Sequence, residues 1–273
     1  MSIIQGTAKS GGTVAASFYD YPIGDSLRFD GSSYLSRDYT STNGTTQFLN
    51  IIFSVWAKMS DPSATGRMFL FATDKATNGT QEGTSGNATD RGGNGYVFGW
   101  DNNSTVYTVS YGGESSFPST GKYRDPSAWY HLVLHIQGNS FKIYINNSLV
   151  VNTSADSTRD SFNFRKSTIG AYNAVNYYSD SDVIASFFKG YLANVHCIQN
   201  STNAVPSLPS GASNWAEAFG ETNNGIWVPK EYTGSYGTNG FHLDFSPASI
   251  VYSGTTIIQI NDVSGNNNHW AAN

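Results

Sequence analysis

Two polar stretches that carry aromatic residues are the part of this sequence best suited to recognising a ligand. Aromatic rings stack on the apolar faces of sugars, and neighbouring amide and carboxylate groups hydrogen-bond to sugar hydroxyls. Tyrosine-rich loops also form protein interfaces, because a tyrosine gives a large contact area at a low cost in entropy. The composition therefore leaves both a glycan and a protein open as the ligand. The candidate ligand-binding residues are Trp100, Asp101, Asn102, Tyr172, Tyr177 and Tyr178.

Carboxylates close to the second stretch suggest a calcium site. Asp180 and Asp182 lie two residues apart in a predicted loop, and their oxygens are the hard ligands that Ca2+ prefers. The alternative is a solvated polar loop, which needs no metal. No stretch of the chain has the ligand spacing of a calcium-binding helix-loop-helix motif. Calcium is therefore the only cofactor that the sequence suggests.

The histidines are less suited to metal binding. His131 and His135 lie four residues apart on a predicted strand, so they share a face but stand about 13 Å apart, too far to bind one zinc ion. His196 and Cys197 are adjacent in another predicted strand and point to opposite faces. Cys197 is the only cysteine, which excludes an internal disulfide. We expect structural imidazoles and a thiol in the core.

Strands must position these residues, because apolar and polar residues alternate through most of the chain. Residues 130–136 and 141–145 alternate on either side of a polar turn, which predicts a β-hairpin. Charged residues are scarce, and Gly, Ser, Thr and Asn are abundant, as in proteins with many short strands and tight turns. The fold class is therefore all-β, with antiparallel sheets. Further strands are expected at residues 53–59, 68–72, 96–100 and 106–111, with a long loop at 73–95.

The same pattern divides the chain into three parts. Residues 1–24 lack alternation and end in an aromatic cluster, so we expect an N-terminal anchoring arm. Residues 25–200 carry the strands of a sandwich. Residues 201–273 form a C-terminal extension that begins rich in Asn, Ser and Pro and then alternates at 241–245 and 256–260. Unpaired strands so apolar would invite aggregation, so we expect them to complete or flank the same sandwich, with pairing to a neighbouring subunit as the alternative.

Charge and hydropathy exclude several classes of protein. The net charge is -5 and Lys and Arg form no cluster, which argues against nucleic-acid binding. No stretch is long and apolar enough for insertion into a membrane. The N-terminus lacks the basic region and apolar stretch of a secretory signal, so we expect a product made in a host cytoplasm.

Three of the predicted strand groups form a set of motifs. They are an opening strand pair at residues 26–37, the hairpin at 129–149, and closing strands at 169–170 and 188–195. Together they resemble the laminin G-like branch of the concanavalin A-like lectin and glucanase superfamily. The turn after the hairpin's tyrosine strand is Asn146-Asn147 instead of the family's usual Asn-Gly, and it still tolerates positive φ. The resemblance implies a jelly-roll sandwich of two antiparallel sheets, often with a calcium ion at its rim.

A narrower similarity involves the C-terminal part of the chain. Residues 219–245 and 262–270, together with residues 3–7, look similar to a sequence type found in virion proteins of marine tailed phages. This similarity implies a structural protein of a virus particle, such as a fibre, an adhesin or a capsid decoration. The expected partners are then other virion proteins, host-surface glycans and further copies of the chain in a homo-oligomer, and the expected location is the virion.

An enzymatic function is not expected. Glycosidases place two carboxyl groups across the scissile bond, and glucanases of the resembled superfamily carry them on glutamates that alternate along one strand. None of the five glutamates of this chain has an acidic residue two positions away. The expected function is a virion structural module for decoration or for attachment to host glycans. The alternatives are a free glycan-binding adhesin or lectin and a degenerate glycosidase.

Overall fold

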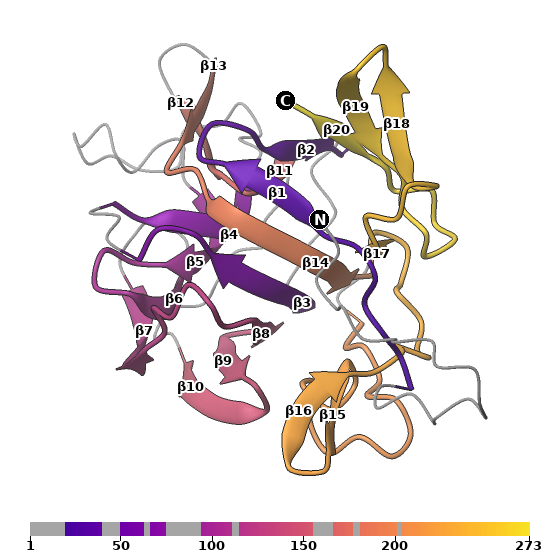
Figure 1. Cartoon of the computed structure of the whole chain (residues 1–273). Coiled ribbons are helices and arrows are strands. Elements are labelled where there is room, and N and C mark those ends of the chain that lie inside the picture. The colour runs from indigo at the N-terminus through magenta and orange to yellow at the C-terminus, as the bar shows by residue number, and fades with distance from the viewer. Residues whose placement is uncertain are drawn as a thin grey trace.

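The computed structural model describes residues 20–39, 50–62, 66–74, 94–110, 115–154, 166–176, 181–200 and 204–273. These ranges form strands, turns and extended segments, and they include no helix that could cross a membrane. Most strands belong to two large antiparallel sheets that pack face to face as a sandwich (Figure 1). The expected all-β fold with antiparallel sheets is confirmed.

One sheet, sheet A, brings together strands from the whole chain. Its strands are β1 (Leu27–Asp30), β3 (Asn50–Met59), β8 (Tyr130–Gln137), β9 (Ser140–Ile145), β10 (Ser148–Ser154), β14 (Lys189–Ile198) and β17 (Phe241–Leu243). They are hydrogen-bonded in the order β1, β14, β3, β8, β9, β10, and β17 also pairs with β14. The long strands β14, β3 and β8 therefore form the centre of this sheet.

The second sheet, sheet B, has nine strands. They are β2 (Leu35–Asp38), β4 (Met68–Asp74), β5 (Asn94–Trp100), β6 (Thr105–Ser110), β7 (Ser115–Lys122), β11 (Lys166–Ile169), β18 (Ile250–Ser253), β19 (Thr256–Ile260) and β20 (Trp270–Ala272). Their order is β18, β19, β20, β2, β11, β4, β5, β6, β7. Two separate hairpins complete the fold: β12 (Tyr172–Asn176) with β13 (Ser181–Ala185), and β15 (Gly220–Asn223) with β16 (Ile226–Pro229).

The hairpin of β8 and β9 forms as its alternation predicts. Leu134 lies opposite Ile143 and Ile136 lies opposite Phe141, and all four side chains are in the core between the sheets. The next turn, into β10, uses Asn146 and Asn147 at φ values of 47° and 68°. Two successive residues at positive φ are what a tight turn matched to the twist of the strands requires, and asparagine tolerates them.

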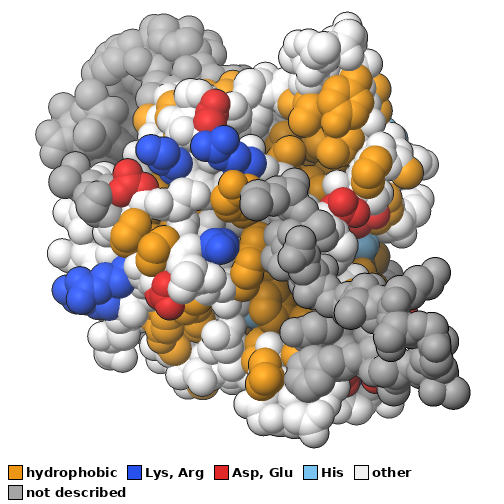
Figure 2. Space-filling view, viewed as in Figure 1, with side chains coloured by type: hydrophobic (Ala, Val, Ile, Leu, Met, Phe, Trp, Pro, Cys, Tyr) orange, Lys and Arg blue, Asp and Glu red, His pale blue; other side chains and the backbone are white. Residues whose placement is uncertain are grey.

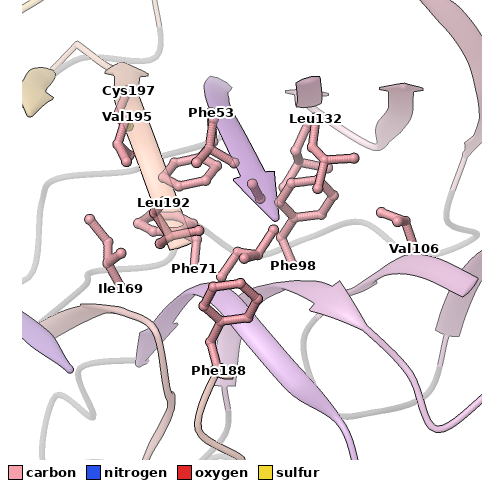
Figure 3. Close-up of a cluster of buried hydrophobic side chains, with 14 of the residues drawn as sticks. Phe53, Phe71, Phe98, Val106, Leu132, Ile169, Phe188, Leu192, Val195 and Cys197 are labelled. Atoms are coloured by element: carbon pink, nitrogen blue, oxygen red, sulfur yellow. The ribbon is translucent and has the colours of Figure 1, made fainter. Parts of the chain in front are cut away.

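The core between the sheets is rich in phenylalanine (Figure 3). Phe53 of β3 stacks on Phe71 of β4 with ring centroids 4.6 Å apart, and Phe98 of β5 packs edge-on against Phe53 at 6.2 Å. Such aromatic pairs add to the stability gained from burial. Cys197 lies in the same cluster as a buried thiol, and its burial raises its pKa to about 12. Cys197 is thus a core residue, as expected.

The C-terminal strands belong to both sheets of this sandwich. In sheet A, Leu243 of β17 lies opposite Val195 of β14. In sheet B, β20 pairs with β2, and the last residue, Asn273, exchanges two backbone hydrogen bonds with Tyr34 at 2.9 and 3.1 Å. Phe241 and Trp270 meet in the core with ring centroids 4.8 Å apart. The extension therefore closes the core in which the earlier strands lie.

One carboxylate organises the turn between β19 and β20. Asp262 accepts hydrogen bonds through Oδ1 from the backbone N–H groups of His242 and Ser264 at 2.8 and 2.9 Å. Its Oδ2 accepts from the Ser264 hydroxyl and the Asn268 backbone, each at 2.9 Å. The Asn268 amide in turn donates to the Gly240 carbonyl at 2.8 Å. This polar run of the sequence is therefore a structural clamp that joins the last turn to β17.

The hairpin of β18 and β19 projects from the edge of sheet B. Figure 2 shows apolar side chains gathered over it. Tyr252 and Ile258 are 53% and 44% exposed there, whereas Trp270 of the neighbouring β20 is fully buried. The C-terminal extension therefore contains both surface and core positions, which allows a matched test of its contribution to stability.

We expect Trp270→Ala to lower the free energy of unfolding by about 3–5 kcal/mol, because it leaves a cavity between the sheets. The matched control is Tyr252→Ala, which should change it by less than about 0.5 kcal/mol. Urea denaturation followed by circular dichroism measures both values. Equal, small effects of the two substitutions would show that the extension is not needed to close the core.

Candidate functional site

The outer face of sheet B, which points away from the core, carries a small aromatic cluster. Phe69 of β4, Val97 of β5 and Tyr107 of β6 are buried there. Tyr172 of β12 packs on this cluster, with its ring centroid 5.4 Å from that of Phe69. The ring centroids of Phe69 and Tyr107 are 5.9 Å apart. The hairpin of β12 and β13 thus rests on sheet B through one of the predicted ligand-binding residues.

Strand alternation decides which side chains reach this outer face. In β5, Tyr96, Phe98 and Trp100 point into the core and Val97 points out. Trp100 is fully buried, stacks on Phe188 at 5.9 Å and donates a hydrogen bond from Nε1 to the Tyr123 carbonyl at 3.0 Å. The prediction that Trp100 lies exposed in a recognition loop is wrong. Trp100 is the last residue of β5, within the strand expected at residues 96–100, and the alternation of that strand turns the indole inward with Tyr96 and Phe98.

The turn after Trp100 keeps its polar residues at the surface. Asp101 is half-buried, and its Oδ1 accepts hydrogen bonds from the backbone N–H groups of Asn103 and Thr105 at 2.9 and 3.0 Å. Asn102 is exposed at the tip of this turn. The Asp101 carboxylate therefore holds the turn between β5 and β6 in place and presents the Asn102 amide to solvent.

Tyr107 is the residue around which the polar groups gather. It is 1% exposed, and its hydroxyl has no hydrogen-bond partner among the described residues. The Arg67 guanidinium lies over its ring, 5.5 Å from the centroid, and the Arg67 side chain is exposed. Burial raises the pKa of Tyr107, Arg67 opposes this shift, and Asp101 and Tyr172 reinforce it. Arg67, Asp101 and Tyr172 therefore surround one phenol.

We call Arg67, Asp101, Asn102, Tyr107 and Tyr172 the sheet B patch. It brings together three residues that the sequence had singled out as loop residues, namely Asp101, Asn102 and Tyr172. Arg67 and Tyr107 were not among the residues predicted from the sequence. Tyr107 could have been found from the alternation of β6, in which Val106 faces the core. Arg67 precedes β4 and carried no periodic signal.

The remaining predicted site residues fall outside what the structure describes. Tyr177, Tyr178 and Asp180 lie in an undescribed range, and of Asp182 only the backbone is described, in β13 opposite Val175. Within the described ranges, His, Cys, Asp and Glu side chains form no group of three or more that could hold a metal ion. Calcium binding by Asp180 and Asp182 thus stays a prediction.

The histidines of sheet A have structural partners. His131 is fully buried and points away from the core, as does His196, whereas the adjacent Cys197 points into it. The Nδ1 of His131 accepts a hydrogen bond from Trp227 Nε1 at 3.0 Å, and its Nε2 lies 2.8 Å from the Ser54 hydroxyl. These contacts agree with the expected structural imidazoles and with opposite faces for His196 and Cys197.

We expect Trp100→Ala to cost about 3–5 kcal/mol of unfolding free energy, because the side chain is part of the core. Asn102→Ala, two residues along the same turn, should cost less than about 0.5 kcal/mol. Thermal and urea unfolding of both variants provide the measurement. A cost below about 1 kcal/mol for Trp100→Ala would contradict its buried position.

The chain was compared with known protein families and solved structures. A family model described as the concanavalin A-like lectin/glucanases superfamily matches residues 29–204. Among solved structures, a putative carbohydrate-binding protein from Bacteroides ovatus is 11% identical with a TM-score of 0.47, over 91% of this chain and 57% of that chain.

Two further structures have similar values. The sialidase module CBM40 of Ruminococcus gnavus, bound to α2,3-sialyllactose, is 11% identical with a TM-score of 0.45, over 67% of this chain and 92% of the module. Domains LG4-5 of the mouse laminin α1 chain are 14% identical with a TM-score of 0.40, over 67% of this chain and 47% of theirs. No curated protein sequence matches the chain at comparable significance. Since the family model covers well over half of its residues, the chain belongs to the concanavalin A-like lectin/glucanase superfamily.

Proposed function

We propose that this chain is a non-enzymatic glycan-binding module and that the sheet B patch contacts the sugar. The observation that carries the proposal is the gathering of Arg67, Asp101 and Tyr172 around the Tyr107 phenol, on a face of the sandwich that is not part of the core between the sheets. A sugar site needs an aromatic ring beside several hydrogen-bonding groups of different kinds. The sheet B patch has both.

Each group has a defined part in this proposal. The half-buried Tyr172 ring, held against Phe69, offers its remaining exposed area to the apolar face of a sugar. The exposed Arg67 guanidinium donates hydrogen bonds to neighbouring hydroxyls, and the exposed Asn102 amide both donates and accepts. Because Asp101 is fixed by two backbone hydrogen bonds, the turn is ordered before binding, which limits the entropy lost on binding.

The three glutamates within the described ranges support binding without hydrolysis. Glu217, Glu221 and Glu231 all lie in the C-terminal extension, whereas the sheet B patch lies between β4 and β12. The Glu217 carboxylate accepts hydrogen bonds from the Ser213 backbone at 2.8 Å and the Asn147 amide at 3.4 Å, so it has a structural use. Among the described residues, the patch contains one carboxylate, Asp101, where a glycosidase uses two.

The test is a glycan array followed by titration of the best ligand. We expect Arg67→Ala and Tyr172→Ala each to weaken binding at least about tenfold, equivalent to about 1.4 kcal/mol. The matched controls are Lys142→Ala and Tyr252→Ala, which remove the same kinds of side chain from positions on β9 and β18. Melting temperatures of all four variants establish that each remains folded.

The array and the titration distinguish glycan binding at the patch from binding elsewhere, from protein binding and from hydrolysis. Binding of a glycan with loss in the two patch variants alone supports the proposal. Equal affinity in patch and control variants would place the site elsewhere, and an array without any bound glycan would favour a protein as the ligand of this face. Release of reducing sugar from a bound oligosaccharide would overturn the non-enzymatic part of the proposal.

We further propose that the module works on a virus particle, as a decoration or an attachment protein that assembles with other virion proteins and with copies of itself. The similarity of residues 219–245 and 262–270 to virion proteins of tailed phages supports this role. The alternative is a free adhesin. Mass spectrometry of purified particles should find the chain at a fixed ratio to the major capsid or tail protein, and its presence only in the soluble fraction would contradict the proposal.

A further inference from the structure

The outer face of sheet A is covered by the chain's own C-terminal extension, unlike the face that carries the sheet B patch. Residues 204–239, which we call the cover segment, run between β14 and β17 and include the hairpin of β15 and β16 (Figure 1). Trp215, Phe219 and Tyr232 of this segment pack on sheet A residues that include Ile52 and Val133. This interface is largely apolar, but three histidines lie beneath it.

His131 is held in one protonation state by the cover segment. An indole nitrogen can only donate, so the hydrogen bond from Trp227 Nε1 makes His131 Nδ1 an acceptor. His131 is therefore neutral, with its proton on Nε2, where it can donate to the Ser54 hydroxyl 2.8 Å away. If Nδ1 were also protonated, its N–H group would face the Trp227 Nε1–H group, and the hydrogen bond between them would be lost. The closed cover segment is thus incompatible with a charged His131.

His196 and His242 form a stacked pair next to His131. Their ring centroids are 4.1 Å apart and the rings are 19° from parallel. Tyr236 of the cover segment lies almost parallel to both, and its hydroxyl is 2.9 Å from His196 Nδ1. His242 Nε2 is 2.7 Å from the Asn194 side-chain oxygen. Two imidazolium rings at this separation would repel each other strongly in a buried site.

The surroundings of the pair offer little to stabilise a positive charge. His196 Nε2 is buried and has no hydrogen-bond partner among the described residues. Asp262 and Asp244 are the carboxylates that could balance a charge on His242. Asp262 already accepts four hydrogen bonds. Asp244 accepts one from the Ser246 backbone N–H at 3.0 Å. The titratable groups facing the pair are His131, Tyr232, Tyr236, Asp244 and Asp262. Tyr21 and Glu231 act on Tyr236, which itself stacks on both rings of the pair.

The burial of the three histidines lowers their pKa values. Burial lowers the pKa of His131 to about 3 and that of His242 to about 4, the latter against the opposing effect of Asp244 and Asp262. Burial, with the charges of His242 and His131, also holds the pKa of His196 well below its usual value. All three rings are therefore neutral while the cover segment is closed.

We propose that the cover segment is an acid-released latch, which leaves sheet A when protons enter the buried histidines while the sandwich itself stays folded. A histidine exposed by opening regains a pKa of about 6.5. The closed state therefore has its full stability above pH 6.5 and loses it as the pH falls toward the closed-state values. An exposed histidine is half protonated at about pH 6.5, so the full tenfold rise of the opening constant per histidine and pH unit is reached only below about pH 6. The stacked pair therefore raises the opening constant roughly 10³-fold between pH 6.5 and 4.5.

Hydrogen–deuterium exchange of the intact chain tests the latch. Protection factors, corrected for the intrinsic pH dependence of exchange, should fall at least a hundredfold for amides of residues 215–236 between pH 6.5 and 5.0. Amides of β3 and β8 should keep their protection over the same range. Constant protection in residues 215–236, or a parallel loss in all strands, would overturn the proposal without any variant.

A double variant assigns the effect to the stacked pair. His196→Phe keeps an aromatic ring against Phe219, and His242→Gln keeps an amide donor for Asn194. The pH dependence of cover-segment protection should then drop by about two decades per pH unit relative to the wild type. His269→Gln, outside the stack, should keep the wild-type dependence. An unchanged slope in the double variant would overturn the assignment.

Because the latch lies on sheet A and the sugar patch on sheet B, glycan binding at pH 7.5 reports on the patch alone.

Discussion

The alternation of side chains along strands that are covered on both faces is the constraint on which the rest of this structure depends. In β8, Leu132, Leu134 and Ile136 point into the core between the sheets, while His131 and Val133 point to the opposite face. A strand covered on one side only could leave these residues in water. Here both faces have to be filled, and the two outer faces are filled in different ways.

The outer face of sheet B is covered locally and the outer face of sheet A by a distant segment. On sheet B, the hairpin of β12 and β13 comes directly after β11, which belongs to the same sheet. On sheet A, the cover segment returns from beyond β14, so that Trp227 meets His131 across 96 positions of the chain. Long-range pairing of this kind carries a larger loop-closure cost. The attachment of this segment therefore depends on the apolar interface and the histidine contacts beneath it.

Sequence reasoning succeeded where the information is local. The hairpin of β8 and β9, the next turn at Asn146 and Asn147 into β10, and the core position of Cys197 all follow from period-two alternation and turn chemistry. It failed at Trp100, which stands where an apolar strand meets a polar turn. The strand expected at residues 96–100 already contained Trp100, and its alternation with Tyr96 and Phe98 predicts a side chain in the core. The polar residues that follow Trp100 were given more weight than this alternation.

Neither outer face could have been assembled from the sequence. The polar groups around Tyr107 come from the start of β4, the turn after β5 and the start of β12. The histidine stack joins β14 and β17 through an interface that exists only when the cover segment is in place. Spacing along the chain showed that His131 and His135 could not share a metal, but it said nothing of the partners that keep His131 neutral.

The two faces also differ in how firmly each is built into the sandwich, and this difference gives them separate uses. The sheet B patch rests on residues within the range that matches the superfamily, and Asp101 ties its turn to the backbone of β6. The cover segment lies beyond that range, yet it fills a face whose polar groups stay buried only while their histidines are neutral. Groups so far apart and without shared partners contribute additively. A change at the histidine stack should therefore leave the patch intact, so that the proposed glycan binding and the proposed acid response can vary independently in one small fold.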